Sequence, residues 1–261
     1  MVKAQVTVFI IIAVVVVAAI GGAVYMSQAN KVDKEFFNSA AVKPQVNNIQ
    51  TGILDCAEQT SMDAIEIIGI QGGYYDKPND YFDLGWAFIP YYYNQGKFSM
   101  PLTRTIEMEI KKAVDDNLNF CLDELDFEGF DLSYKTSRTK VSIKESSVEL
   151  TIDIPVVIEK EGKKITFELE EFPLDVESNL QAMLEVADYI TEGHKENPEM
   201  ICISCVADMA RERDLFVDML DFDGETTTLI VITNNQSSVP FAFEFLNKYP
   251  ENSGNLPIPG P

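Results

Sequence analysis

The feature that most constrains this chain is an uncharged apolar run close to its start. The run extends from Val6 to Tyr25 and reads VTVFIIIAVVVVAAIGGAVY. A helix needs about 20 such residues to cross a bilayer. A cleaved secretory signal has a shorter apolar region, of about 7 to 15 residues, and ends at a small-residue cleavage site. We therefore expect a retained transmembrane helix over residues 5–26, preceded by a cytoplasmic tail or leader at 1–4.

Four cysteines, an even number, are typical of disulfides formed outside the cytoplasm. The close spacing of Cys202 and Cys205 makes them the obvious local pair and leaves Cys56 with Cys121, one of three pairings that four cysteines allow. A four-cysteine zinc site would usually have two close pairs, and only one is present. A redox-active Cys-x-x-Cys is the other alternative, but no strand-to-helix pattern surrounds this one. We expect structural disulfides, and hence a single-pass membrane protein whose C-terminal domain is outside.

Charge excludes one class of partner. All 42 acidic residues follow residue 30, only Lys3 is basic before it, and the whole chain carries a formal charge of −22. A chain this acidic repels phosphate backbones, so we expect no nucleic-acid partner. The same charge keeps a surface protein soluble.

The residues that open the apolar run, Lys3-Ala4-Gln5-Val6-Thr7-Val8-Phe9, resemble the class III signal of archaeal type IV pilins and archaellins. The resemblance implies cleavage between Ala4 and Gln5, and a helix that anchors the subunit and packs into a filament core, which would form a homo-oligomer through the helix. Phe9 stands where many pilins carry a glutamate, and a plain signal anchor is the alternative.

A second resemblance lies beyond the run. The segments 56–60 (CAEQT), 68–74 (IGIQGGY) and 119–122 (NFCL) are similar to uncharacterised membrane-anchored proteins of small-genome archaea. That resemblance implies no activity.

Hydrophobic spacing predicts an α+β fold for the part outside the membrane: amphipathic helices packed on an antiparallel β-meander. We expect a stalk at 27–44, one domain at 45–249 and a disordered tail at 250–261. The predicted helices are 45–70, 101–125, 177–191 and one after Val206; the predicted strands form a meander over 140–174 and a hairpin of 226–233 with 241–246. Cys56 and Cys121 lie on the apolar stripes of the first two helices, which supports their pairing.

The segment between these two helices, Gly72 to Pro101, is unusually aromatic, with ten aromatic rings in 30 residues. Rings with a polar tip suit contact with sugars or proteins, because a large rigid face binds at low entropic cost. We select Trp86, Tyr91, Tyr92 and Tyr93 as candidate binding residues. The alternative is a long loop or hairpin that covers the core with its own aromatic cluster.

Signals for catalysis are sparse, and we expect no enzyme, cofactor or metal site. His194, the only histidine, lies beside Gly193 at the exit of a predicted helix and is interpreted as a C-terminal cap rather than a base. Asn235 begins an Asn-Gln-Ser sequon that glycan would occupy on the cell exterior. The sequence therefore favours a membrane-anchored surface protein, structural or adhesive, that binds a protein or glycan. Alternatives are a pilin-like filament subunit and an extracellular hydrolase using two carboxylates.

Overall fold

The computed structural model describes residues 33–196, 201–224, 226–234 and 241–250. They belong to two compact units. The first comprises Met1–Ile53, Leu125–Lys135 and Pro155–Glu168, and the second comprises Leu54–Glu124, Thr136–Ile154 and Leu169–Pro261, in each case for the residues described. The helix α2 (Lys43–Ile70) contributes its first part to one unit and the rest to the other.

The first unit is built on a small antiparallel sheet. Its strands are β4 (Asp131–Tyr134), β7 (Pro155–Lys160) and β8 (Lys163–Glu168), with β7 in the centre. The hairpin between β7 and β8 turns through Glu161 and Gly162, which have φ values of 53° and 73°, the left-handed conformation that a two-residue type I′ turn requires.

Residues at the end of the predicted stalk are part of this unit. Phe37 and Val42 are buried, and the Lys163 ammonium lies 3.8 Å from the ring centroid of Phe36. The backbone N–H of Lys164 donates to a carboxylate oxygen of Asp33 at 3.3 Å. The β7–β8 hairpin is therefore held against the segment that precedes α2.

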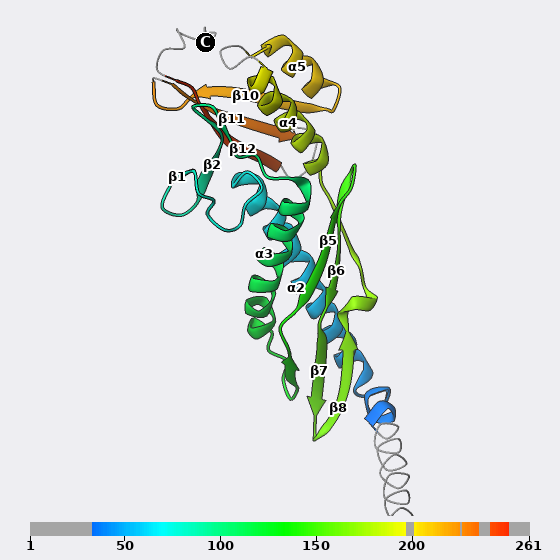
Figure 1. Cartoon of the computed structure of the whole chain (residues 1–261). Coiled ribbons are helices and arrows are strands. Elements are labelled where there is room, and N and C mark those ends of the chain that lie inside the picture. Colours follow the sequence, from blue (N-terminus) through cyan, green and yellow to red (C-terminus); the bar gives the residue numbers. More distant parts are fainter. Residues whose placement is uncertain (1–32, 197–200, 225, 235–240, 251–261) are drawn as a thin grey trace, which may run out of the picture. The chain divides into compact units, whose positions relative to one another are not determined.

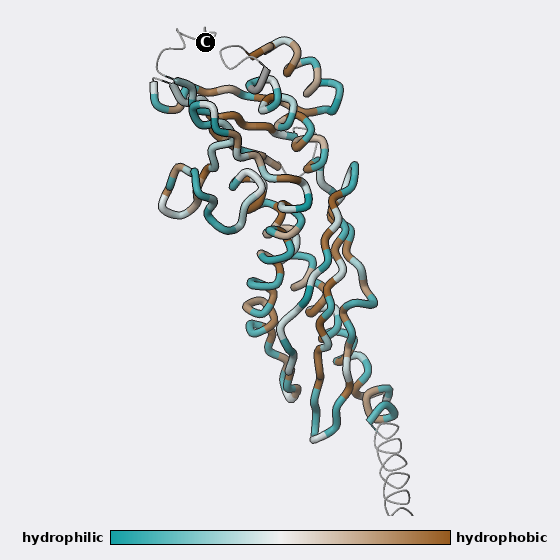
Figure 2. The backbone as a smooth tube through the Cα atoms, viewed as in Figure 1, coloured by the Kyte–Doolittle hydropathy of each residue, from teal (hydrophilic) through white to brown (hydrophobic). Residues whose placement is uncertain are grey.

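The second unit contains a mixed sheet in the order β1-β2-β12-β11-β10, with β3 also paired to β2 (Figure 1). The strands are β1 (Tyr81–Asp83), β2 (Phe88–Asn94), β3 (Lys97–Phe98), β10 (Leu215–Asp221), β11 (Thr227–Asn234) and β12 (Phe241–Lys248). β11 and β12 are strongly hydrophobic (Figure 2), and their inward side chains Ile230, Ile232, Phe243 and Phe245 are fully buried. The helices α4 (Leu180–Glu196) and α5 (Ile203–Arg211) pack beside this sheet: α4 contacts β2, and α5 contacts β10.

A second sheet of this unit is antiparallel and packs with helix α3 (Thr103–Glu124). It has the order β5 (Arg138–Ile143), β6 (Ser147–Asp153) and β9 (Leu174–Glu177). The outer edge of β5 is protected by carboxylates of α3, since Asp115 accepts the N–H of Thr139 at 2.9 Å and Glu107 accepts that of Ile143 at 3.1 Å. Edge N–H groups satisfied in this way cannot pair with another chain.

The disulfide pairing predicted from the helical stripes is confirmed. Cys56 of α2 is bonded to Cys121 of α3, with the Cα atoms 5.8 Å apart, and Cys202 is bonded to Cys205. The first of these closes a loop with a sequence separation of 65 residues. Restricting the unfolded chain over such a loop stabilises the fold by about 4 kcal/mol in the chain-entropy model.

The predicted helices of residues 45–70, 101–125 and 177–191 are confirmed by α2, α3 and α4, and the terminal hairpin by the antiparallel pairing of β11 with β12. The helix expected after Val206 begins earlier, at Ile203, and ends at Arg211. β10 begins after it, at Leu215. Residues 251–261 of the predicted tail lie outside the described residues.

The predicted fold class, a transmembrane helix followed by helices on one β-meander, is wrong. Over residues 33–196, 201–224, 226–234 and 241–250, no helix has both the length and the apolarity to cross a membrane. The helix predicted at 5–26 lies outside the described residues. The meander is also divided: β6 pairs with β5 and β9, whereas β7, which begins at Pro155, pairs with β4 and β8. Alternation identifies the buried face of a strand but not its neighbours, so the division and the parallel pairing of β2 with β12 could not be inferred from it.

Candidate ligand-binding site

The aromatic segment begins with turns and loop over residues 72–80 and then forms β1, β2 and β3, at one side of the mixed sheet. β2 lies next to β12 in this sheet and pairs with it in parallel. The turn between β2 and β3 uses Gln95 and Gly96, with φ values of 49° and 96°, to reverse the chain tightly.

Two of the predicted binding residues are core residues. Tyr92 is 0% exposed, its ring stacks on Phe245 with centroids 4.3 Å apart, and its hydroxyl donates to the carbonyl oxygen of Gly72 at 2.8 Å. Tyr93 is 1% exposed and stacks on His194. Neither ring is accessible to a partner, which corrects their selection as binding residues.

Trp86 lies at the surface, with 79% of its area exposed, in the turn between β1 and β2. The turn is closed by a backbone hydrogen bond from Leu84 to Ala87 and by the carboxylate of Asp83, which accepts the N–H of Gly85 at 2.7 Å. Trp86 is accessible to a partner, but it is not among the residues that line the cavity described next.

A cavity of about 470 Å³ lies within this segment. All ten of its described lining residues come from the stretch between Gly72 and Pro101: Tyr74, Lys77, Pro78, Asn79, Asp80, Pro90, Tyr91, Lys97, Ser99 and Met100. Tyrosine rings and prolines supply flat apolar faces, whereas an amide, a hydroxyl, a carboxylate and two ammonium groups supply hydrogen bonds. Ligand pockets typically combine apolar walls with a few polar groups, in volumes of roughly 300–1,000 Å³.

Several interactions hold the walls of the cavity in place. The hydroxyl of Tyr74 donates to the carbonyl oxygen of Ser99 at 2.9 Å, and Lys97 forms an ion pair with Asp80. The carboxylate of Glu109, on α3, accepts the backbone N–H of Tyr75 at 2.9 Å and that of Asp76 at 3.0 Å. The walls of the cavity are therefore anchored to α3 and to β3.

Both lysines that line the cavity form ion pairs. Lys97 is paired with Asp80, which also lines the cavity, and Lys77 is paired at 2.7 Å with Asp83, which lies outside the lining. Burial and the nearby carboxylates of Asp223 and Asp80 raise the pKa of Tyr91, so its hydroxyl stays protonated at neutral pH and can donate a hydrogen bond. The site presents paired charges and neutral donors, rather than an excess of either sign, to a ligand.

A second cavity, also of about 470 Å³, runs beside α4 and is lined in part by the carboxylates of Glu185, Asp188 and Glu192. Arg213 donates to Glu185 at 2.9 Å, and this hydrogen bond lowers the pKa of Glu185. A hydrolytic general acid needs the opposite shift, a raised pKa that keeps the carboxyl protonated. Glu185 is therefore not suited to be the general acid of the carboxylate hydrolase expected as an alternative.

His194 was expected to cap a helix, but it lies inside α4, which continues to Glu196, and its ring is 0% exposed. Its Nε2 atom is hydrogen-bonded to the hydroxyl of Tyr249 at 2.9 Å, and burial lowers its pKa to about 4. The residue lines neither cavity. His194 is a neutral core residue rather than a base.

The remaining predicted site residues, Ala4, Gln5 and Asn235, lie outside the described residues. Among the cavity residues, sequence reasoning selected only Tyr91. Lys77, Asn79 and Asp80 were missed, although a polar Lys-Pro-Asn-Asp turn inside an aromatic stretch was the signal that could have drawn attention to them.

Comparison of the chain with protein-family models, with curated proteins and with solved structures found no match.

Proposed function

We propose that this chain is a binding protein of the cell exterior and that the cavity of the aromatic segment binds a neutral glycan. The observation that carries the proposal is the composition of the cavity: its lining combines flat faces from Tyr91 and Pro90 with hydrogen-bonding groups from Asn79, Asp80 and Lys97. A sugar ring has an apolar face of C–H groups and a rim of hydroxyls, so it needs both kinds of wall.

The ion pair between Asp80 and Lys97 supports a sugar ligand in particular. Neighbouring hydroxyls of a sugar both donate and accept hydrogen bonds, and a carboxylate beside an ammonium group offers one acceptor and one donor. The hydroxyl of Tyr91 adds a neutral donor. Since Lys77 and Lys97 are both paired with aspartates, the cavity has no unpaired cation to attract an acidic sugar.

Location outside the cytoplasm is supported by two disulfides and by the strongly acidic composition. We further propose that the uncharged run of residues 6–25 attaches the chain to the cell membrane. Protease treatment of intact cells tests the location: degradation of the cysteine-containing part supports it, and protection of that part until the cells are lysed contradicts it.

Glycan binding is tested with the purified full-length chain on an array of neutral and acidic oligosaccharides, followed by titration calorimetry of the best ligand. Tyr91→Ala removes the flat face and should weaken binding about tenfold or more, whereas Tyr91→Phe keeps the ring and should weaken it less. Trp86→Ala, outside the cavity, is the matched aromatic control and should bind like the wild type.

Two outcomes contradict this assignment. The first is a ligand whose affinity is unchanged by Tyr91→Ala. The second is oligosaccharide binding that Trp86→Ala abolishes, which would place the interaction at the exposed turn between β1 and β2 instead of in the cavity. Thermal unfolding of each variant shows whether it is folded before its binding is compared.

A further inference from the structure

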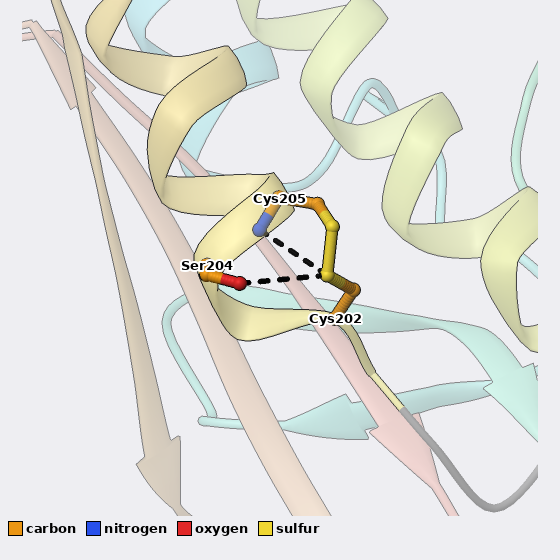
Figure 3. Close-up of a disulfide and its surroundings, with 3 residues drawn as sticks. All are labelled: Cys202, Ser204 and Cys205. Carbon is orange, nitrogen blue, oxygen red and sulfur yellow. Dashed lines mark hydrogen bonds between the residues drawn. A yellow bond between two sulfur atoms is a disulfide. The ribbon is translucent and has the colours of Figure 1, made fainter.

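The disulfide between Cys202 and Cys205 lies at the surface, where α5 begins (Figure 3). Cys202 is the N-cap residue of this helix, and both cysteines are exposed. The apolar residue between them, Ile203, is 49% exposed. A thiol of another molecule therefore has direct access to this bond and an apolar contact beside it.

The Sγ atom of Cys202 is surrounded by hydrogen-bond donors. It accepts the backbone N–H of Cys205 at 3.3 Å, and the hydroxyl of Ser204 lies 3.6 Å away (Figure 3). A disulfide sulfur has no proton to give, so the hydroxyl is the donor. Donors at the first turn of a helix, together with the positive end of its dipole, favour an anionic thiolate over the neutral thiol.

The two disulfides of the chain differ in their surroundings. Cys56 is only 4% exposed and its disulfide ties α2 to α3 across a sequence separation of 65, whereas Cys202 and Cys205 are separated by three positions within one helical turn. A loop this short restricts the unfolded chain far less, so stabilisation is a weak reason for the second disulfide. Exposure and a stabilised leaving thiolate are the properties of a disulfide that exchanges.

We propose that Cys202–Cys205 is an exchangeable disulfide that accepts two electrons from the dithiol of a partner protein. One partner thiolate attacks Sγ of Cys202, forms a mixed disulfide with it and breaks the bond to Cys205, which leaves as a thiolate. The second partner thiolate then attacks the partner sulfur of the mixed disulfide, and Cys202 leaves as a thiolate.

The exchange is balanced. The partner loses two electrons and two protons and gains a disulfide, and Cys202 and Cys205 become a dithiol. In the second step the N–H of Cys205 and the hydroxyl of Ser204 stabilise the departing Cys202 thiolate. The residues of this site do not overlap with those of the glycan-binding cavity, so the two proposals fail or succeed separately.

Graded reduction of the folded full-length chain with dithiothreitol, followed by alkylation and peptide mass spectrometry, tests whether the disulfide exchanges. We expect Cys202 and Cys205 to be alkylated at a reductant concentration about tenfold lower than Cys56 and Cys121. Reduction of both pairs at the same concentration, or of Cys56–Cys121 first, overturns the proposal.

Single cysteine variants test which sulfur forms the mixed disulfide. Cys205→Ser leaves Cys202 as a free thiol with its hydrogen-bond donors, whereas Cys202→Ser leaves Cys205 as the free thiol. The Cys205→Ser variant should react with glutathione disulfide about fivefold faster than the Cys202→Ser variant. Ser204→Ala in the Cys205→Ser background should slow that reaction. Equal rates for the two single variants overturn the assignment to Cys202, and circular dichroism shows whether each variant retains its fold.

Discussion

Burial of His194 makes the stability of the second unit depend on pH. The folded protein has a pKa of about 4 at this residue, against an ordinary value of 6.5, because the ring is removed from water. The unfolded chain therefore binds a proton at a higher pH than the folded chain does. The stabilising effect of the neutral ring is complete above pH 6.5 and is lost as the pH falls from about 6.5 to about 4.

The size of the effect follows from the difference between the two pKa values. Linkage gives a loss of about 2 kcal/mol in the free energy of unfolding between pH 8 and pH 5, and about 3 kcal/mol below pH 4. Burial raises the pKa of Tyr249, whose hydroxyl contacts the ring, so Tyr249 stays protonated throughout this range. It therefore adds nothing to the change at acidic pH.

Urea unfolding followed by circular dichroism at pH 8, 7, 6 and 5 measures this dependence. Carboxylates also titrate at acidic pH; burial raises the pKa of Glu244, for example. The informative quantity is therefore the difference between the wild type and His194→Gln, whose amide can hydrogen-bond to Tyr249 but cannot be protonated in this range. We expect the wild type to lose about 2 kcal/mol more than the variant from pH 8 to pH 5. If the difference in unfolding free energy between the wild type and His194→Gln is the same at all four pH values, the reasoning is refuted.

Two substitutions test contacts within the second unit, one at Gly72 and one at Asp115, both by thermal or urea unfolding. Gly72→Ala should destabilise the protein by about 2 kcal/mol or more, because Gly72 has a φ of 53° and a Cβ there would lie 2.5 Å from the carbonyl oxygen of Glu244. Gly85 has a φ of 86° but open space around it, so Gly85→Ala should lose only the stability that the backbone strain costs. Equal losses of stability in Gly72→Ala and Gly85→Ala would contradict the role of the close approach between Gly72 and Glu244. Asp115→Ala should lower the free energy of unfolding by about 1–3 kcal/mol, because it leaves the Thr139 N–H without its acceptor. Asp116 is exposed, so Asp116→Ala is the control and should have little effect. Similar losses in the two variants would contradict the role of Asp115.

The features that could be predicted depend on neighbouring residues in the chain. Helical periodicity placed Cys56 and Cys121 on apolar stripes of two successive helices, and their disulfide follows from that arrangement. The density of aromatic residues between Gly72 and Pro101 identified the segment that contains the cavity.

The orientation of individual rings could not be predicted in the same way. Tyr92 and Tyr93 are buried because β2 pairs with β12, which lies about 150 positions later, and because α4 brings His194 against Tyr93. Strand alternation would have left one of two adjacent tyrosines at the surface. The redox alternative for Cys202 and Cys205 is disfavoured in the sequence because no strand-to-helix pattern surrounds them. The start of α5 at Ile203, with both cysteines exposed, was not evident from the local pattern.

Sequence alone determined the properties that depend on composition and local spacing, namely the apolar run, the acidic charge and the main helices. It also favoured the observed pairing of the cysteines among the three that are possible. Tertiary structure decided which tyrosines are core and which line a cavity, how β6 and β7 are divided between two sheets, and that the Cys202–Cys205 disulfide is exposed at a helix start. The physical reason is that periodicity records which side of an element avoids water, whereas strand partners and pockets arise from contacts between residues far apart in the chain.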